Sequence, residues 1–302
     1  MKRKLVKQGA ATMMISLPAK WIKEFGLGKG DEVDIDQIES NLIISAKDIQ
    51  KKTSIEIKLT GLMTESSIRT ILTNTYRLGY ENVKVSFDNE SQLKVIKDVV
   101  KTSLLGFDVI KTAENYCIIE NITEPSPDQF DVILQKIFYN ISELFSITKK
   151  RLNDEETVED YRDIEAKLQQ YDNFCRRVIA KKQIAEKNAQ LFWNFLTRIM
   201  HTQREIYHLN RFLDKNKIKV SKQVLNFLDE AEDLFELLKK AYLKKDILIL
   251  EEMHKKEKEL VYKEAYSLLS NIKGKENILV YHITASLRST YLAASPLIGL
   301  LL

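Results

Sequence analysis

The run RKLVKQGAATMMISLPAKWIKEFGLGKGDEVDI, residues 3–35, carries the strongest local structural signals in this chain. The step from Ser16 to Pro18 predicts the start of a helix, because Ser is a preferred cap and Pro suits a first helical turn. Gly26 predicts the end of that helix, since glycine readily adopts the left-handed conformation found there. Apolar runs on both sides are typical of short strands. These strands are predicted over residues 3–7, 12–17, 32–35 and 42–46.

Positive charge is concentrated at this end of the chain. Residues 1–29 hold seven basic residues and one acid, a net charge of +6, whereas the whole chain carries +4 and the remainder therefore −2. A basic surface of this kind favours salt-sensitive binding to DNA phosphates. On charge alone, a merely solvated basic start is an equal alternative. About fifty residues also bury little core, so pairing with a second copy is expected.

In the order and spacing of its residues, this run resembles the AbrB/SpoVT family of swapped-hairpin DNA-binding domains. The resemblance rests on Arg3-Lys4, Gly9, Thr12, Ser16-Leu17-Pro18, Trp21, Gly26-Leu27 and Gly30-Asp31. It implies an interlocked dimer with one DNA-facing surface, for which the candidates are Arg3, Lys4, Lys7, Thr12, Lys20 and Lys23. Ala10 and Ala11 stand where some members carry an arginine, so phosphate contacts are expected more than base readout. The same fold can also serve only to dimerise, or as an antitoxin.

The composition of the 302 residues predicts a multidomain, mainly α protein. With 44% hydrophobic and 30% charged residues the chain is not of the disordered class. Only 9 Gly and 4 Pro argue for long helices and against a loop-rich sandwich or barrel. Cys117 and Cys175 lack metal or redox spacing and are expected to be buried free thiols. With neither a secretory signal nor a membrane-spanning run, a cytoplasmic protein is expected.

Three domains are predicted. Residues 1–52 form the swapped-hairpin domain, and residues 53–126 alternate strands with helices as an α/β connector. Residues 127–302 are helical, with apolar residues at three- and four-residue spacing. Short fragments recur within them, which predicts two tandem three-helix bundles over 127–215 and 216–302 rather than one irregular bundle. The predicted helices span 128–152, 156–182, 185–214, 218–244, 247–272 and 276–300.

This tandem arrangement resembles PhoU, the phosphate-transport regulatory protein, over residues 127–302. The connector likewise resembles the module between AbrB-like and PhoU-like domains of archaeal-type regulators. Together the resemblances imply a dimeric DNA-binding regulator of phosphate homeostasis. The alternative is an adaptor that docks on a phosphate transporter or sensor kinase and uses its N-terminal domain mainly to dimerise.

A metal site is a further candidate. The PhoU resemblance implies acidic ligands four residues apart, but Glu205 is followed by Leu209, and Ser289 and Ala293 occupy the matching places. Instead, His201, Glu205 and His208 share one helical face, and these are ligand types for Zn²⁺ or Fe. The alternative, a polar stripe of partly exposed histidines, is favoured. His254 and His282 lie isolated in the sequence.

No motif points to an enzyme. The chain lacks a phosphate-binding loop, a dinucleotide fingerprint and a nucleophile in strand–turn–helix context. We therefore predict no catalytic residues.

Overall fold

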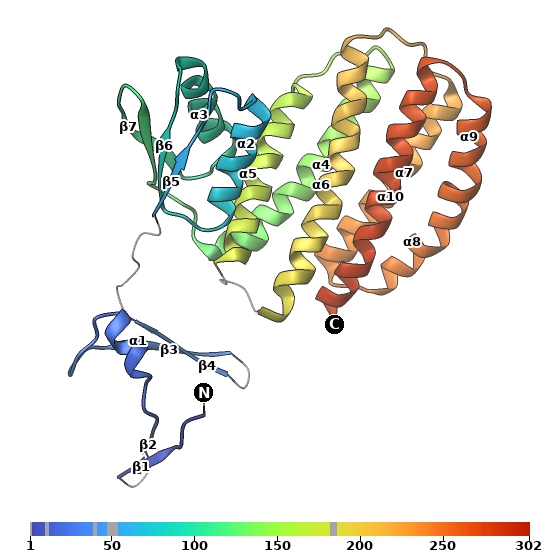
Figure 1. Cartoon of the computed structure of the whole chain (residues 1–302). Helices are drawn as coiled ribbons and strands as arrows, with labels where there is room; N and C mark the ends of the chain where they lie inside the picture. The colour runs from blue at the N-terminus through green and yellow to red at the C-terminus, as the bar shows by residue number, and fades with distance from the viewer. Residues whose placement is uncertain (1, 10–11, 39–40, 47–53, 182–185) are drawn as a thin grey trace. The chain divides into compact units, whose positions relative to one another are not determined.

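The computed structural model describes residues 2–9, 12–38, 41–46, 54–181 and 186–302. The chain divides into two compact units, Met1–Thr53 and Ser54–Leu302, each described here by itself (Figure 1). The first is a small β unit with one short helix, and the second is mainly helical, as the sequence predicts. None of the described helices combines the length and apolar composition that a membrane span needs.

The N-terminal unit consists of two hairpins around a short helix. Strand β1 (Val6–Gln8) pairs antiparallel with β2 (Thr12–Met14), and β3 (Val33–Ile38) pairs with β4 (Asn41–Ala46). Helix α1 spans Ala19–Glu24, and its cap position is Pro18 in extended conformation, without a side-chain cap. The prediction that Ser16 caps this helix is therefore wrong, because the cap position is Pro18, two residues after Ser16.

The described residues of this unit form no hydrophobic core of their own. Among its described residues, none is buried, and α1 contributes only partly covered side chains. Val6, Met13 and Ile35 each expose more than half of their surface. Apolar side chains left in water forgo the burial that stabilises a small domain, so this unit needs a partner surface.

The second unit begins with an α/β module. Its sheet has the strand order β5-β6-β8-β7, in which β5 and β6 are parallel and the other neighbours are antiparallel. The module's elements are β5 (Ser54–Lys58), α2 (Glu65–Arg77), β6 (Asn82–Ser86), α3 (Glu90–Ser103), β7 (Phe107–Thr112) and β8 (Tyr116–Asn121). Both helices start at a side-chain cap, with Thr64 accepting from the Ser67 amide and Asn89 from the Gln92 amide. The module encloses a separate hydrophobic core, which includes the buried Cys117.

Two sets of three helices follow, with their own continuous core (Figure 1). A single 3₁₀ turn, Pro127–Gln129, leads into them. The first set is α4 (Phe130–Leu152), α5 (Tyr161–Ala180) and α6 (Glu186–Asp214). The second is α7 (Lys222–Lys244), then α8 (Leu248–Glu259) continued by a π-helical turn (Leu260–Ala265) and α9 (Tyr266–Asn271), then α10 (Lys275–Leu301). The predicted tandem bundles are confirmed as a fold class.

Aromatic rings join the two sets at their centre. The ring of Phe138 on α4 lies 5.1 Å from that of Tyr242 on α7 and 5.9 Å from that of Phe195 on α6. The Tyr242 hydroxyl donates to Asp131 at 3.0 Å, which gives its buried polar end a partner. The two helical sets therefore share one core.

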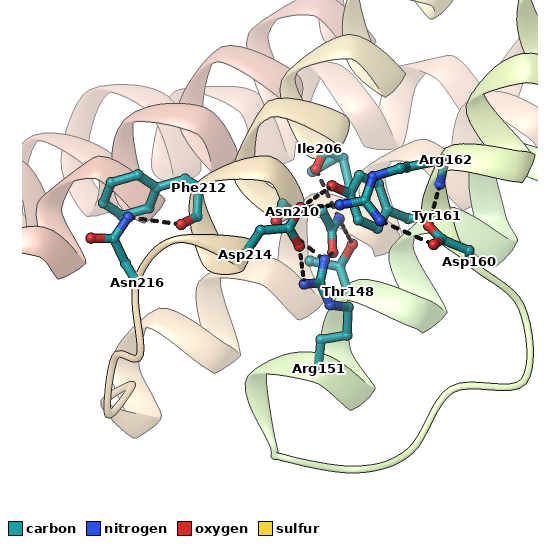
Figure 2. A network of polar contacts seen from close by, with 10 residues as sticks. All are labelled: Thr148, Arg151, Asp160, Tyr161, Arg162, Ile206, Asn210, Phe212, Asp214 and Asn216. Atoms are coloured by element: carbon teal, nitrogen blue, oxygen red, sulfur yellow. Dashed lines mark hydrogen bonds and ion pairs between the residues drawn. The ribbon is translucent and has the colours of Figure 1, made fainter.

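A cluster of polar side chains joins the ends of α4, α5 and α6 (Figure 2). Arg151 and Arg162 both pair with Asp214, and the Tyr161 hydroxyl donates to the same carboxylate at 2.6 Å. Both guanidinium groups lie 4.8 Å from the centre of the Tyr161 ring. Arg162 also pairs with Asp160 at 3.0 Å, so two arginines face two carboxylates, and the cluster fixes the helix ends without a strong net charge.

Arg177 joins the α/β module to the helices. This α5 side chain is fully buried, and its Nη1 donates to the Tyr76 and Tyr80 carbonyl oxygens at 2.7 and 2.9 Å. Its Nε donates to Glu124 at 2.7 Å. Its Nη2 lies 2.9 Å from a Glu81 oxygen, without the alignment of a hydrogen bond.

The groups around Arg177 reinforce the junction. Its guanidinium lies 4.9 Å from the ring centres of Tyr76 and Phe107. Partial burial favours a higher pKa for the Glu81 carboxyl, but hydrogen bonds from Lys181 and Asn121, with the charges of Arg177 and Lys181, lower the pKa overall. Glu81 is therefore a carboxylate at neutral pH, and its charge balances that of Arg177.

We predict that Arg177→Met destabilises the second unit by about 3–5 kcal/mol, since buried carboxylates and carbonyls lose their donor. Urea unfolding of the full chain measures this loss. The control is Arg204→Met on α6, an exposed arginine, for which about 0.5 kcal/mol or less is expected. Equal losses in the two variants would contradict the role assigned to Arg177.

Candidate nucleic-acid interface

All six predicted DNA-binding residues lie at the surface of the N-terminal unit. They are Arg3, Lys4, Lys7, Thr12, Lys20 and Lys23. Arg3 and Lys4 precede the first strand and extend the basic segment that leads into it. Each charge is therefore accessible to a solvent-borne polyanion.

The two lysines of α1 lie together. Lys20 and Lys23 are three residues apart, so they share one side of the helix and both are exposed. On the neighbouring side, the Trp21 and Phe25 rings are in contact, with centroids 5.4 Å apart, and both are partly buried. The helix thus has a basic side for phosphates and an aromatic side that packs.

The hairpin separates Lys7 from Thr12. Lys7 lies opposite Met13, whereas Thr12 lies opposite Gln8, and cross-strand partners share a face. Lys7 and Thr12 therefore project from opposite faces of the β1–β2 ribbon. Gly9 begins its turn with a φ of +72°, a conformation that favours glycine. Ala10 and Ala11, where the sequence departs from its relatives, lie outside the described residues.

A second glycine turn leads from the helix into β3. Gly26 and Gly30 have φ values of +63° and +97°, as expected of the residues that end a helix and form a tight turn. The Asp31 carboxylate accepts the Gly28 amide at 2.7 Å and closes this turn. The placement of the basic helix is thus set by local backbone geometry.

The candidate metal ligands lie on α6, and the structure gives one of them another partner. His201 and His208 are exposed, while the half-buried Glu205 carboxylate accepts a hydrogen bond from His282 Nδ1 of α10 at 2.8 Å. The His208 and His282 ring centres are 6.2 Å apart. Within the described ranges, no three His, Cys, Asp or Glu side chains are close enough to hold a metal ion.

His282, isolated in the sequence, has a partner in the structure. Antiparallel packing of α6 against α10 brings it to Glu205, although the two are far apart in sequence. Partial desolvation of its ring lowers the pKa of His208, and the charges of His282, Arg204 and Arg211 add to this effect against the attraction of Glu205. His254 instead contacts the Tyr291 ring at 5.5 Å.

Comparison with known families identifies the N-terminal unit. Residues 6–54 match the model of the family described as antidote-toxin recognition MazE, bacterial antitoxin. No curated protein and no solved structure matches the chain. The match supports the swapped-hairpin domain inferred from the run at residues 3–35, and the matched family is not one of enzymes. Residues 6–54 therefore form a MazE/AbrB-like domain, a class that binds DNA and self-associates.

The metal prediction requires one zinc or iron atom per chain, bound by His201, Glu205 and His208. Elemental analysis of purified full-length protein should then find that metal, and His201→Ala should lose it while His254→Ala keeps it. Protein that is metal-free as purified, and that takes up no zinc on titration, would end the prediction.

Proposed function

We propose that this protein is a dimeric DNA-binding transcriptional regulator. The observation that carries the proposal is a MazE/AbrB-like unit with a net charge of +6 over residues 1–29 and exposed basic side chains on its helix and first strand. A dimer doubles this charge, which favours tight binding to a polyanion. The six candidate residues would contact phosphates, with Thr12 close to the hairpin turn.

The lack of a core in the N-terminal unit supports the dimer. Its apolar strand residues expose surface that a second copy would cover, which stabilises both copies. Val6 and Met14 lie opposite each other on one face of the β1–β2 ribbon and form the apolar part of that surface.

Phosphate homeostasis is the regulated process that we propose. It rests on the resemblance of residues 127–302 to PhoU, and the tandem three-helix sets support it. In this proposal the helical unit receives the signal or docks a transporter or sensor component, and the DNA-binding unit responds in the cytoplasm.

A second candidate function is that of an adaptor. The matched family is described by recognition of a protein toxin, which favours a unit that binds protein. In that case the N-terminal unit would dimerise the chain, and the helical unit would dock on a phosphate transporter or sensor kinase.

If two copies pair through the apolar face of the β1–β2 ribbon, an acidic residue placed on that face should dissociate the dimer. Sedimentation equilibrium of Met14→Asp should show more monomer than the wild type, whose dimer has twice the 35.1 kDa chain mass. Lys29→Asp, which places an acid in an exposed turn, is the matched control and should remain dimeric. A dimer fraction unaltered by Met14→Asp would count against this face.

The DNA interface predicts that Lys20→Ala with Lys23→Ala weakens binding and flattens its salt dependence. Losing four phosphate contacts per dimer should reduce the slope of log K against log salt by about 2–4. Gel-shift titrations at several salt concentrations measure both effects. The control pair, Lys217→Ala with Lys219→Ala, lies at exposed positions in the helical unit and should bind like the wild type.

The Lys20/Lys23 variant distinguishes the regulator from the adaptor. Unchanged affinity and slope in the Lys20/Lys23 variant would favour the adaptor. Genome-wide DNA capture under high and low phosphate tests the regulated process, since phosphate-dependent enrichment of sites is expected of the regulator.

A further inference from the structure

The second helix of each three-helix set occupies an equivalent place. Moving 89 positions along the chain carries several buried α5 residues onto buried residues of the helix formed by α8, the π-helical turn and α9, although others, such as Phe174 and Val178, fall on exposed positions. The aligned pairs are Tyr161 with Leu250, Ile164 with Met253, Leu168 with Glu257, and Ile179 with Leu268. The outward positions of the two helices can therefore be compared one by one.

In the first set, the outward face of this helix is covered by the α/β module. Gln170 donates to the Lys101 carbonyl at 3.0 Å, and Asn173 donates to the Ser103 carbonyl at 2.8 Å. Arg177 makes the buried contacts described above. Three successive outward positions thus hold a neighbouring module.

In the second set, the same face is open. The residues equivalent to Gln170, Asn173 and Arg177 are Glu259, Tyr262 and Tyr266. All three are exposed, and the tyrosines show 51% and 50% of their surface. Their rings are 5.9 Å apart, so they form one aromatic patch. A face that binds protein in one set therefore offers large uncovered aromatic side chains in the other.

This patch is one end of a longer stripe. Up to Glu259 the exposed residues recur at spacings of four and three, which places them on one side of α8. The two tyrosines in contact follow within and just after the π-helical turn. We call this the α8 stripe, and it consists of Leu248, Glu252, Lys255, Glu259, Tyr262 and Tyr266. Leu248 shows 80% of its surface, so both ends of the stripe are apolar and its middle is charged.

The residues of the α8 stripe are complementary to those of the same stripe on a second copy that runs in the opposite direction. When two copies lie antiparallel about a two-fold axis at residue 257, Leu248 faces Tyr266, Glu252 faces Tyr262, and Lys255 faces Glu259. These pairs are an apolar contact, a hydroxyl donating to a carboxylate and an ion pair, and the two-fold axis makes each occur twice. Glu259 also pairs with Lys263 of its own helix at 2.6 Å, and a carboxylate can accept from both lysines.

We propose that the α8 stripe is an interface between two copies of this chain, packed as an antiparallel helix pair. The self-complementary order of the six residues selects a second copy as the occupant, since a different protein would require no such symmetry. An exposed helix pair of this size binds weakly by itself. A dimer formed through the N-terminal unit would raise the local concentration and favour the pairing. The interface does not depend on DNA binding.

A cysteine beside the two-fold axis tests the packing in the full chain. Lys258 is exposed and adjacent to the axis, and Ser270 is exposed near the far end of α9. Native Cys117 and Cys175 are buried, and burial raises the pKa of the Cys117 thiol to about 11, so neither competes. Under mild oxidation, Lys258→Cys should give at least about tenfold more disulfide-linked dimer than Ser270→Cys, because only its thiols are held together.

Charge exchange provides the second test, in the Lys258→Cys background. Adding Glu259→Lys places like charges opposite each other twice and should reduce cross-linking about fivefold. Adding Lys255→Glu as well restores the attraction and should return cross-linking to the parental amount. Both sites are exposed, and circular dichroism verifies that each variant remains folded.

Two outcomes would overturn the proposal. One is equal cross-linking of Lys258→Cys and Ser270→Cys, as random collision or docking of a different protein would give. The other is equal cross-linking with the single and the double charge change. Since DNA binding and dimerisation of the N-terminal unit are measured with Lys20, Lys23 and Met14, failure here leaves those proposals standing.

Discussion

The second unit depends on one buried guanidinium. Arg177 lies between two hydrophobic cores, donates hydrogen bonds to two backbone carbonyls and to Glu124, and forms an ion pair with Glu81. Arginine suits this place, because its planar fork reaches several acceptors at once while it lies 4.9 Å from the ring centres of Tyr76 and Phe107. A buried charge is costly unless it is fully paired, so these contacts also hold the module in one position.

The N-terminal unit, by contrast, is limited by how little apolar surface it buries. It has many exposed apolar side chains, no buried described residue and a net charge of +6 over residues 1–29. The same shortage of core that calls for a second copy would also bring two basic helices into one particle. Dimerisation and DNA binding are therefore physically linked in the proposed function, whereas the α/β module and the helices form a unit with complete cores of their own.

The two three-helix sets differ in what covers the outward face of their second helix. Two sets with the same helix order present the same outward positions, but Gln170, Asn173 and Arg177 are covered by a module of their own chain, while Glu259, Tyr262 and Tyr266 face solvent. The candidate metal face shows a comparable change. The acidic spacing of the resembled family is absent, and Glu205 is instead joined to His282 across the contact between α6 and α10.

Much of the fold follows from the sequence by itself. Helical periodicity, glycine positions and the clustering of Lys and Arg predicted the strands, the tandem helices and the basic N-terminal unit, because these signals act between residues close in the chain. The start of α1, the partner of His282 and the role of Arg177 could not be predicted in this way. The last two depend on which residues meet across 77 to 101 positions of chain, and only tertiary packing brings such groups into contact and removes the water between them.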